Sequence, residues 1–441
     1  MKRSWYTLLI ALCALCVQPM RAQDFARMSE RTIMGTARYV GMSGAMSAIG
    51  GDPTAVLDNP AGLGLYQRSE VLVTFDETLD YSRQVGSKTQ WFRHQFMCPQ
   101  ASLVISIPTF TTNDKGVQSY NMMFAYRRMH SFGRTYEATG ANDASLGAIL
   151  PALNISFCTD PVNETNTLYL REWGYVNEYS FDWSLNIGHR WYVGMGIHVQ
   201  DYLLSGDAIY KETFDAFNTE GVQLYNKNNS GLQYKGVSCD FSFGLLYRPT
   251  KWLRLGIGLQ TPSLGVLRTY TSGTFSAQTD SLRHSVAPDI TFADRSFHLP
   301  LHVSSSVAFQ IGAYGMISLQ HDYIKQLKEP AVHSLRAGVE VIPVLGMYIN
   351  AGYAYESTFK PATDIVPIDP TFDRQDTYFL HPRQTQYASF AIGYRGAFFL
   401  VQAAYQYRWQ NINLYAHEAA RPYDMHADTH RIVLTFGWHR N

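Results

Sequence analysis

Long apolar runs, paired cysteines and a surplus of one charge are all missing from this chain of 441 residues. No segment after residue 22 approaches the roughly 18 uninterrupted apolar residues of a membrane-spanning helix, which excludes such helices. Three cysteines, Cys98, Cys158 and Cys239, follow residue 22. Their odd number and spacing favour neither a disulfide framework nor a zinc site. His-Glu-X-X-His and Gly-X-Ser-X-Gly motifs are also absent, which argues against an enzyme.

The first 22 residues form a separate unit that predicts a secretory signal peptide. Lys2 and Arg3 precede a short apolar core, and Ala22 is a small residue suited to cleavage. The whole chain has 36 basic and 36 acidic residues. Cleavage would remove Lys2, Arg3 and Arg21 and no acid, so the mature chain would carry a small negative net charge. We therefore expect an exported protein that does not bind nucleic acid.

The strongest positive signal is an alternation of apolar and polar residues. In residues 237–247 every second position is apolar, and the positions between are mostly polar or small. Residues 253–260 repeat the pattern in the same phase. A period of two predicts strands with two different faces, and a series of such strands is typical of a transmembrane β-barrel. We therefore predict an all-β protein, a transmembrane antiparallel barrel in the outer membrane of a Gram-negative cell.

About fourteen strands are expected, an even number as in bacterial single-chain barrels. Their connections alternate between tight turns rich in Gly and Pro and long segments, which predicts short periplasmic turns and long outer loops. The long segments are 131–178, 203–235, 261–299, 357–384 and 410–427. The predicted strands are 69–79, 99–108, 118–130, 179–188, 191–202, 236–248, 251–260, 300–311, 313–323, 333–343, 346–356, 385–395, 397–409 and 428–440.

The alternation also assigns a face to each strand residue. Lipid-facing positions are mainly aliphatic or aromatic, as in the final strand with Ile432, Leu434, Phe436 and Trp438. Charged residues fall on the lumen face, where they form structural ion pairs or bind ligand; the candidates are Asp240, Arg254, Arg336 and Glu340. Aromatic residues of the long segments either line an apolar entry groove or belong to an interfacial girdle or to loop packing, and these are Tyr169, Trp173, Tyr175, Tyr210, Phe214 and Phe217.

Residues 23–68 lack the alternation and precede the first strand. Asp52 is suited to cap a short helix that begins with Pro53. Asn59 is followed by Pro60 and Ala61, and these three predict a tight turn because proline disfavours helix in the residue before it. A barrel of this width would otherwise enclose an open channel. We therefore expect residues 23–68 to form a hatch inside the lumen of a barrel built from residues 69–441.

Residues 50–63, Gly-Gly-Asp-Pro-Thr-Ala-Val-Leu-Asp-Asn-Pro-Ala-Gly-Leu, resemble the hatch signature of the FadL/TodX family of outer-membrane transporters. Residues 38–45 are similar to a Bacteroidetes-type branch of that family, and residues 247–262 resemble its hairpin before an outer loop. The resemblance implies a fourteen-stranded barrel closed by an N-terminal hatch. It also implies passive uptake of hydrophobic compounds, such as long-chain fatty acids or aromatic hydrocarbons. The hatch and gating residues would be Asp52, Asn59, Pro60 and Ala61.

In this family, movement of the hatch lets the compound leave sideways at a kinked strand. The third predicted strand is the least regular, with Met122, Met123 and Phe124 in succession. The expected partners are a hydrophobic small molecule or lipid, the surrounding outer-membrane lipid and the barrel-assembly machinery. We expect a monomer without metal or cofactor. The main alternative is a FadL-like component of a type IX protein secretion system without small-molecule transport, and a plain porin is disfavoured by the long hatch segment.

Overall fold

The computed structural model describes residues 29–109, 115–140, 165–217, 223–279, 282–286, 291–325, 331–357, 378–416 and 421–439. The predicted signal peptide therefore lies outside the described residues. Within the described part of the chain, no helix is both long and apolar enough to cross a membrane.

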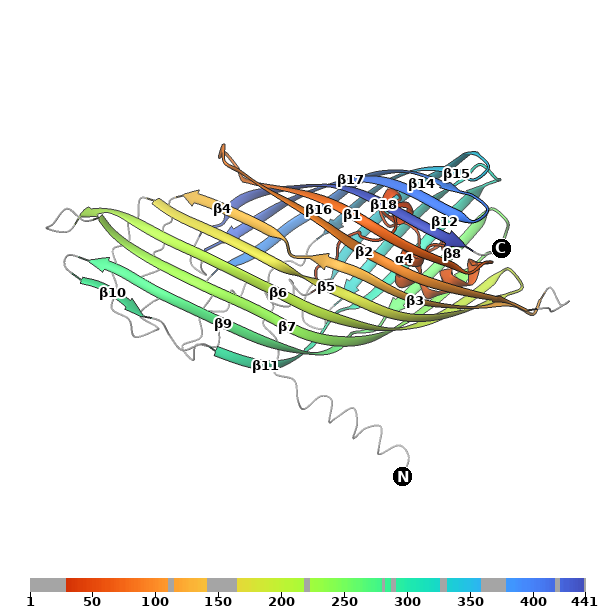
Figure 1. The fold of residues 1–441 in the computed structure, drawn as a ribbon, viewed down its shortest axis with the longest axis horizontal. Helices are drawn as coiled ribbons and strands as arrows, with labels where there is room; N and C mark the ends of the chain where they lie inside the picture. The colour runs from red at the N-terminus through yellow and green to blue at the C-terminus, as the bar shows by residue number, and fades with distance from the viewer. Residues whose placement is uncertain are drawn as a thin grey trace, which may run out of the picture.

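The described residues form one closed antiparallel barrel, shown in Figure 1. Its segments are β1 (Glu70–Gln84), β2 (Gln90–Pro108), β3 (Val117–Ser131), β4 (Arg134–Gly140), β5 (Thr165–Ile187), β6 (Trp191–Phe217), β7 (Gln223–Tyr247), β8 (Leu253–Gln260), β9 (Leu264–Thr279), β10 (Leu282–Val286), β11 (Thr291–His298), β12 (Leu301–Ile311), β13 (Gly315–Lys325), β14 (Val332–Val344), β15 (Met347–Ser357), β16 (Phe379–Arg395), β17 (Phe399–Tyr415) and β18 (Tyr423–His439).

The barrel closes where β1 pairs with β18. Three strands of the barrel are each made of two or three segments. These are β3 with β4, β8 with β9, and β12 with β10 and β11. β3 and β4 both pair with β5, and β8 and β9 both pair with β7. β10 and β11 pair with β9, while β12 pairs with β8. The segments therefore make a barrel of fourteen strands, which confirms the predicted fold and strand number.

Each predicted strand overlaps one segment of the barrel. The prediction of long loops is wrong, because part of each predicted loop is strand in the structure. β5, β6 and β7 have 23, 27 and 25 residues, whereas a membrane-spanning strand needs only about 9–11. β4, β9, β10 and β11 also lie within segments that we expected to be loops. The strands thus continue well past the membrane region on one side of the barrel (Figure 1).

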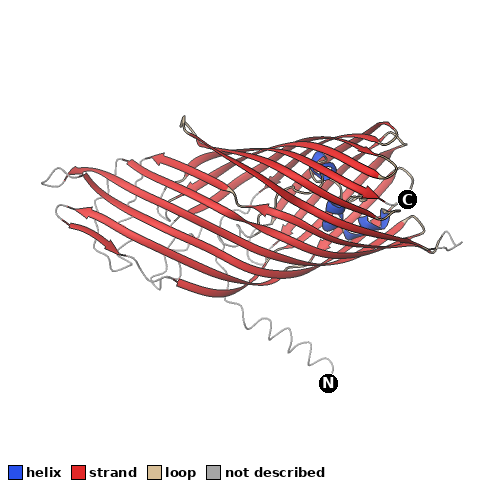
Figure 2. Cartoon of the chain, in the orientation of Figure 1, coloured by secondary structure: helices blue, strands red, loops and turns tan. Residues whose placement is uncertain are grey.

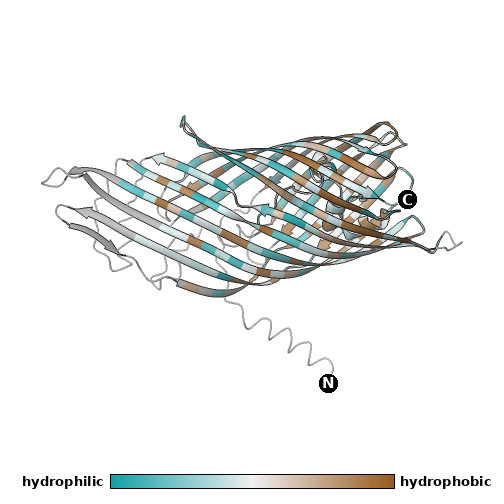
Figure 3. Ribbon diagram, in the orientation of Figure 1, coloured by the Kyte–Doolittle hydropathy of each residue, from teal (hydrophilic) through white to brown (hydrophobic). Residues whose placement is uncertain are grey.

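The outer surface of the barrel is apolar near one end. Alternate residues of β6, Trp191, Val193, Met195, Ile197 and Val199, are all exposed, and the same holds for the predicted lipid-facing residues of β18. Figure 3 shows hydrophobic residues concentrated at the end that carries the C-terminus, and more hydrophilic residues along the strand extensions. This band is the surface expected to contact lipid.

Inside that end of the barrel lies the plug segment, which we define as residues 29–69. It contains α3 (Ala37–Gly41), α4 (Pro53–Asp58) and a 3₁₀ helix, η1 (Pro60–Leu65). These are the short helices enclosed by strands in Figure 2. Most of the segment from Ile33 to Gly64 is buried, and its apolar side chains pack on inward residues of the wall such as Ala391 and Val433. The plug segment therefore occupies the lumen.

Candidate functional site: the plug and the lateral gap

The turn between α4 and η1 is held by capping side chains. Asp52 caps α4 by accepting hydrogen bonds from the backbone N–H of Thr54 at 2.9 Å and of Ala55 at 3.4 Å, and Pro53 follows as the first helical residue. Asn59 Oδ1 accepts from the Ala61 N–H at 3.1 Å, and Asn59 Nδ2 donates to the Ser47 carbonyl at 3.0 Å. The structure therefore brings the four predicted hatch residues, with Pro60 opening η1, into one buried turn.

This turn lies directly against glycines of the wall. A Cβ on Gly244 of β7 would lie 2.2 Å from Asn59 Oδ1 and 2.6 Å from the Ala61 nitrogen. A Cβ on Gly194 of β6 would lie 2.3 Å from the Pro60 carbonyl carbon. Any larger residue at these positions would clash with the plug. Residues 59–61 thus pack directly against the backbone of Gly194 and Gly244 in the wall.

Asp58, the last residue of α4, is the centre of a buried charge cluster that joins the plug to the wall. Its carboxylate lies 3.2 Å from Arg127 of β3 and 3.7 Å from Arg336 of β14, and it accepts a 2.5 Å hydrogen bond from the Tyr39 hydroxyl. The two arginines are fixed in turn by wall carboxylates, Glu178 for Arg127 and Asp322 for Arg336, at 2.8 and 2.9 Å. We call Tyr39, Asp58, Arg127 and Arg336 the Asp58 cluster.

The other predicted lumen residues also face inward, but they do not converge on one site. Glu340 binds Arg38 of α3 at 2.6 and 2.8 Å. Asp240 accepts hydrogen bonds from Gln200 at 2.6 Å and Gln260 at 2.9 Å, beside His198. Arg254 donates to the Ile49 carbonyl at 2.9 Å. Glu340, Arg254 and Arg336 therefore contact the plug segment, whereas Asp240 belongs to a polar network of the wall.

The third barrel strand is broken, though not at the residues that looked irregular in the sequence. Met123 points into the lumen while Met122 and Phe124 point outward, so the alternation is regular there. The register with β5 shifts between Arg128 and His130. The strand then stops at Phe132 and Gly133 before β4 begins. The interruption therefore lies at the outer end of the predicted strand rather than at its centre.

A lateral gap opens in the wall beside this break. The ladder between β2 and β3 runs only from Pro108 to Gln100, which pairs with Arg127. Among the described residues no ladder joins residues 90–98 of β2 to residues 128–140 of β3 and β4. Pro99 lies at the end of the ladder and beside a bulge with β1, a position typical of proline in sheets because it has no N–H to donate.

Side chains bridge the lateral gap instead of backbone hydrogen bonds. Ser131 donates to Gln95 at 3.0 Å, and Arg93 reaches the Glu172 carbonyl at 3.3 Å. Farther along β2, Trp91 donates to Glu137 at 2.9 Å. Each such bond contributes about 0.5–3 kcal/mol, which is no less than a backbone bond, but these side-chain bonds are fewer than the bonds of a continuous ladder. The lateral gap is therefore covered by side chains but held together by few hydrogen bonds.

The start of the plug segment lies behind the lateral gap. The Thr32 N–H donates to the Met129 carbonyl at 3.0 Å, and the Thr32 hydroxyl lies 2.7 Å from His130. Glu30 forms an ion pair with Arg134 at 2.9 Å. Burial would raise the pKa of Glu30, but Arg134 and His130 outweigh it and lower the pKa to about 2. The pair therefore stays charged at all physiological pH values.

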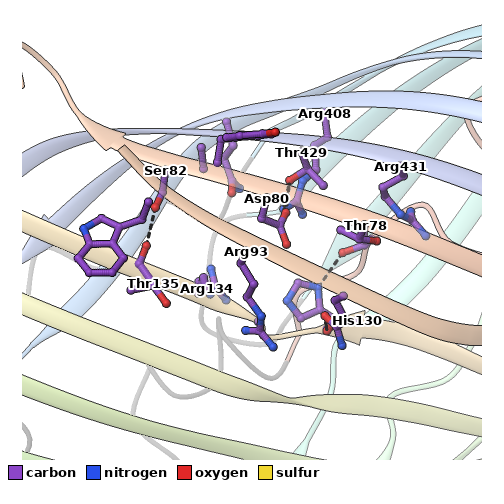
Figure 4. Close-up of a pocket in the computed structure, with 18 of the residues that line it drawn as sticks. Thr78, Asp80, Ser82, Arg93, His130, Arg134, Thr135, Arg408, Thr429 and Arg431 are labelled. Atoms are coloured by element: carbon purple, nitrogen blue, oxygen red, sulfur yellow. Dashed lines mark hydrogen bonds and ion pairs between the residues drawn. The ribbon is translucent and has the colours of Figure 1, made fainter. Parts of the chain in front are cut away.

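A small cavity of about 60 Å³ lies between residues 30–34 and the gap. Figure 4 shows side chains from several strands converging on it, among them Arg93, His130, Arg134 and Arg408. Ligand sites for small molecules usually measure about 300–1,000 Å³. The cavity therefore holds no more than a few waters, and a larger molecule fits here only if the plug or the wall moves.

The outer half of the lumen is mainly apolar, although Asn166, Glu172 and Glu212 are also buried there. Beyond the membrane region the faces of the strands exchange character, so that in β6 the inward residues change from His198 and Gln200 to Tyr202, Leu204 and Tyr210. Two clusters of buried apolar residues lie in this part of the barrel. One of them includes Tyr136 and Ala427, which also line the cavity at the gap. Part of the apolar surface of the outer lumen thus reaches the lateral gap, where charged residues such as Arg93, Arg134 and Arg408 also line the cavity.

The aromatic residues of the predicted loops separate into two groups. Tyr210 is buried in the apolar lumen. Trp173 is 37% exposed on the outer face of β5, and Tyr169 packs edge-on against Trp91 with ring centroids 5.6 Å apart. Tyr175 lies beside Arg128, also on the outer face. Only Tyr210 therefore belongs to the lumen, while the side chains of Phe214 and Phe217 lie outside the described residues.

No protein-family model matches the chain, and no curated protein matches it in sequence. Solved structures do share its fold. A FadL homologue of Pseudomonas aeruginosa superposes with a TM-score of 0.56 at 12% identity, covering 93% of this chain and 99% of that chain. The monoaromatic hydrocarbon channel CymD gives 0.54 at 10% identity, and the toluene transporter TodX of Pseudomonas putida gives 0.50 at 11%, both with the same coverage.

The chain therefore has the fold of the FadL and TodX barrels, as the sequence predicted. A closed antiparallel barrel with an apolar outer band is the architecture of proteins of the outer membrane, where the open edges of a sheet are not tolerated. The protein is accordingly an outer-membrane β-barrel. Within the described residues, no three His, Cys, Asp or Glu side chains are placed to hold a metal ion.

Proposed function

We propose that this protein is a passive channel for hydrophobic compounds, which enter the apolar outer lumen and leave sideways through the lateral gap when the plug segment moves. The observation that carries the proposal is the missing ladder between residues 90–98 and 128–140, together with the apolar cluster of the outer lumen whose Tyr136 and Ala427 reach the gap from inside. A hydrophobic solute that leaves through the wall reaches the membrane interior without crossing the periplasmic water.

The charged lower lumen supports this route over a straight one. Below the gap, the lumen holds the plug segment, most of which is buried, and the Asp58 cluster, whose charged side chains are at most 11% exposed. A hydrophobic molecule moving down the barrel axis would displace ion pairs and leave charged groups without partners, which costs about 3–5 kcal/mol for each pair broken. Leaving through the gap breaks the side-chain bonds of Gln95, Ser131, Arg93 and Trp91, and it also requires movement of the Glu30–Arg134 ion pair behind them. The sideways route therefore disturbs one ion pair, whereas the axial route breaks the pairs of the Asp58 cluster and the Arg38–Glu340 pair.

The plug is connected to the residues at which the gap begins. Gln100 and Arg127 are the last pair of the β2–β3 ladder. Helix α4 contacts both, since Thr54 donates a hydrogen bond to Gln100 and Asp58 forms an ion pair with Arg127. Movement of α4 would remove support from this last pair. We infer that displacement of the plug lengthens the gap by loosening the ladder at its upper end.

Uptake by whole cells tests the proposed channel. Cells that lack their own transporters for hydrophobic compounds would express this protein, and uptake of labelled oleate and of labelled toluene would be measured separately. A double variant, Asn59→Ala with Pro60→Ala, at equal surface expression would show whether residues of the plug turn matter. The native protein should accelerate uptake of at least one compound.

The two compounds separate the cargo classes. Faster uptake of oleate alone favours fatty acids, and faster uptake of toluene alone favours small aromatic hydrocarbons. No acceleration of either compound, with a correctly folded barrel at the cell surface, would contradict the channel proposal. In that case copurification with secretion partners, and loss of protein export on deletion, would test the secretion alternative.

A further inference from the structure

A second cavity, of about 310 Å³, lies at the end of the barrel that carries the short turns, between the plug segment and the wall. The plug contributes Ile49, Gly50 and Gly51 to its lining. The wall contributes Arg248, just beyond the end of β7, and Arg254 of β8. Arg38 and His189 also line it, and its described lining includes no Asp or Glu. The cavity is therefore basic, although the chain as a whole has no basic surplus.

Two of its arginines have no carboxylate partner. Arg38 is neutralised by Glu340 at 2.6 Å. Arg254 instead donates to the neutral Ile49 carbonyl at 2.9 Å and to Gln310 at 3.0 Å, and Arg248 donates to the Lys251 carbonyl at 3.2 Å. Among the described residues, no acidic side chain forms a salt bridge with either. The Nε atoms of Arg248 and Arg254 are both buried without a hydrogen-bond partner.

Arg248 is partly exposed to solvent, but the buried Nε donors of Arg248 and Arg254 have no acceptor. Two guanidinium groups that share one cavity repel each other, and buried N–H donors without an acceptor carry a desolvation cost of about 1–3 kcal/mol or more for charged groups. An oxyanion removes both costs, because its oxygens accept from guanidinium N–H groups and its charge balances theirs. We propose that this basic cavity binds a small oxyanion, a phosphate or carboxylate group, between Arg248 and Arg254.

The position of the site suggests what binding would do. Ile49 belongs to the plug segment, and its carbonyl already accepts from Arg254. An anion held by Arg248 and Arg254 would therefore fix the part of the wall on which residues 49–51 rest. The group can come from a free anion or from the head of a lipid or amphiphile. The proposal concerns binding at the short-turn end and does not depend on the proposed channel function.

Calorimetric titration of the detergent-solubilised full-length protein tests the site. Inorganic phosphate and acetate would be titrated separately at constant ionic strength, since salt screens exposed charges. We expect saturable binding of at least one anion to the native protein. The double variant Arg248→Gln, Arg254→Gln should bind it at least tenfold more weakly. The matched control is Arg268→Gln, which removes an arginine from an exposed ion pair with Asp294 and should leave the affinity unchanged.

The two anions distinguish the source of the ligand. Binding of phosphate but not acetate indicates a phosphate group, such as a lipid head, and the reverse result indicates a carboxylate. Heat-dependent mobility in gels would establish that each variant has a folded barrel, and Arg248→Gln alone serves if the double variant does not fold. Absence of saturable binding of both anions to the native protein would overturn the proposal. Equal affinity in native protein and folded variant would overturn it as well.

Discussion

Replacement of Asp58 by asparagine should release the plug segment while leaving the barrel intact. The asparagine side chain has nearly the same volume as that of aspartate but carries no charge. Arg127 and Arg336 would then each lose one carboxylate contact, at 3.2 and 3.7 Å, and Tyr39 would face an amide instead of a carboxylate. The barrel should still fold, because its ladders and its apolar outer face do not involve residue 58.

The size of the effect depends on the contacts that Arg127 and Arg336 keep in the Asp58→Asn variant. Removing one partner of a buried ion pair usually costs about 3–5 kcal/mol. Here each arginine keeps a second carboxylate, Glu178 or Asp322, and an amide oxygen still accepts one hydrogen bond. We therefore expect a loss of about 2 kcal/mol in the free energy that holds the plug in the lumen. At about 1.4 kcal/mol for each factor of ten, the displaced population should rise about 30-fold.

Thiol labelling measures that population. Ser47 is buried in the plug, so Ser47→Cys, with Cys98, Cys158 and Cys239 changed to serine, reacts with a maleimide only when the plug opens. The Asp58→Asn substitution should raise the labelling rate about 30-fold. Asp294→Asn, which breaks the exposed pair with Arg268, is the matched control and should leave it unchanged. A rate within twofold of the parent, in a folded Asp58→Asn barrel, would refute this account of the cluster.

Substitutions at three further positions, each with a comparison variant, use the same labelling assay. Asn59→Ala leaves the Ser47 carbonyl and the Ala61 N–H without partners and should cost about 2–4 kcal/mol. Asn59→Ser keeps a neutral side chain that can cap the Ala61 N–H and should cost less. Equal rates for both would argue against the Asn59–Ala61 hydrogen bond. Gly244→Ala places a Cβ 2.2 Å from Asn59 Oδ1 and should reduce the free energy that holds the plug in the lumen by about 1–3 kcal/mol. Gly231→Ala is the control, because the nearest atom there is the Ser272 hydroxyl at 2.9 Å and no plug residue is close. Asp52→Ala should cost about 1 kcal/mol through the lost cap, and Asp52→Asn should restore most of it, since asparagine caps equally well; failure of the rescue would show that the charge matters more than the hydrogen bonds.

The barrel was readable from the sequence because lipid and water impose opposite demands on the two faces of one strand. Trp191 to Val199 of β6 alternate without exception in the membrane region, so their faces were predicted correctly. The rule fails where the strand leaves the membrane. Beyond Asp201 the outer face meets water and the inner face is apolar, as at Leu204 and Tyr210. In the sequence, the apolar residues therefore move from the odd-numbered to the even-numbered positions of β6. This change is the signal that would have located the apolar part of the lumen.

The turn at residues 52–61 was predictable because its causes are local. A cap at Asp52, proline at positions 53 and 60, and Asn59 between them specify the backbone without reference to the wall. The Asp58 cluster and the lateral gap were not predictable in this way. Asp58 and Arg336 are far apart in sequence, and the gap depends on the absence of pairing between two strands. Pro99 and Gly133 mark its edges, but only the register shows that no ladder joins them.

Reversible closure of the lateral gap tests the central claim most directly. Gln95→Cys and Ser131→Cys, in protein without other cysteines, replace side chains that meet at 3.0 Å across the gap, and a short cleavable reagent would join the two thiols. A control pair, Ser305→Cys and His321→Cys, lies directly opposed on the intact β12–β13 seam. Uptake of the transported compound should fall at least tenfold when the gap is joined and recover when the reagent is cleaved, with no change in the control. Unchanged uptake through a joined gap would contradict sideways release.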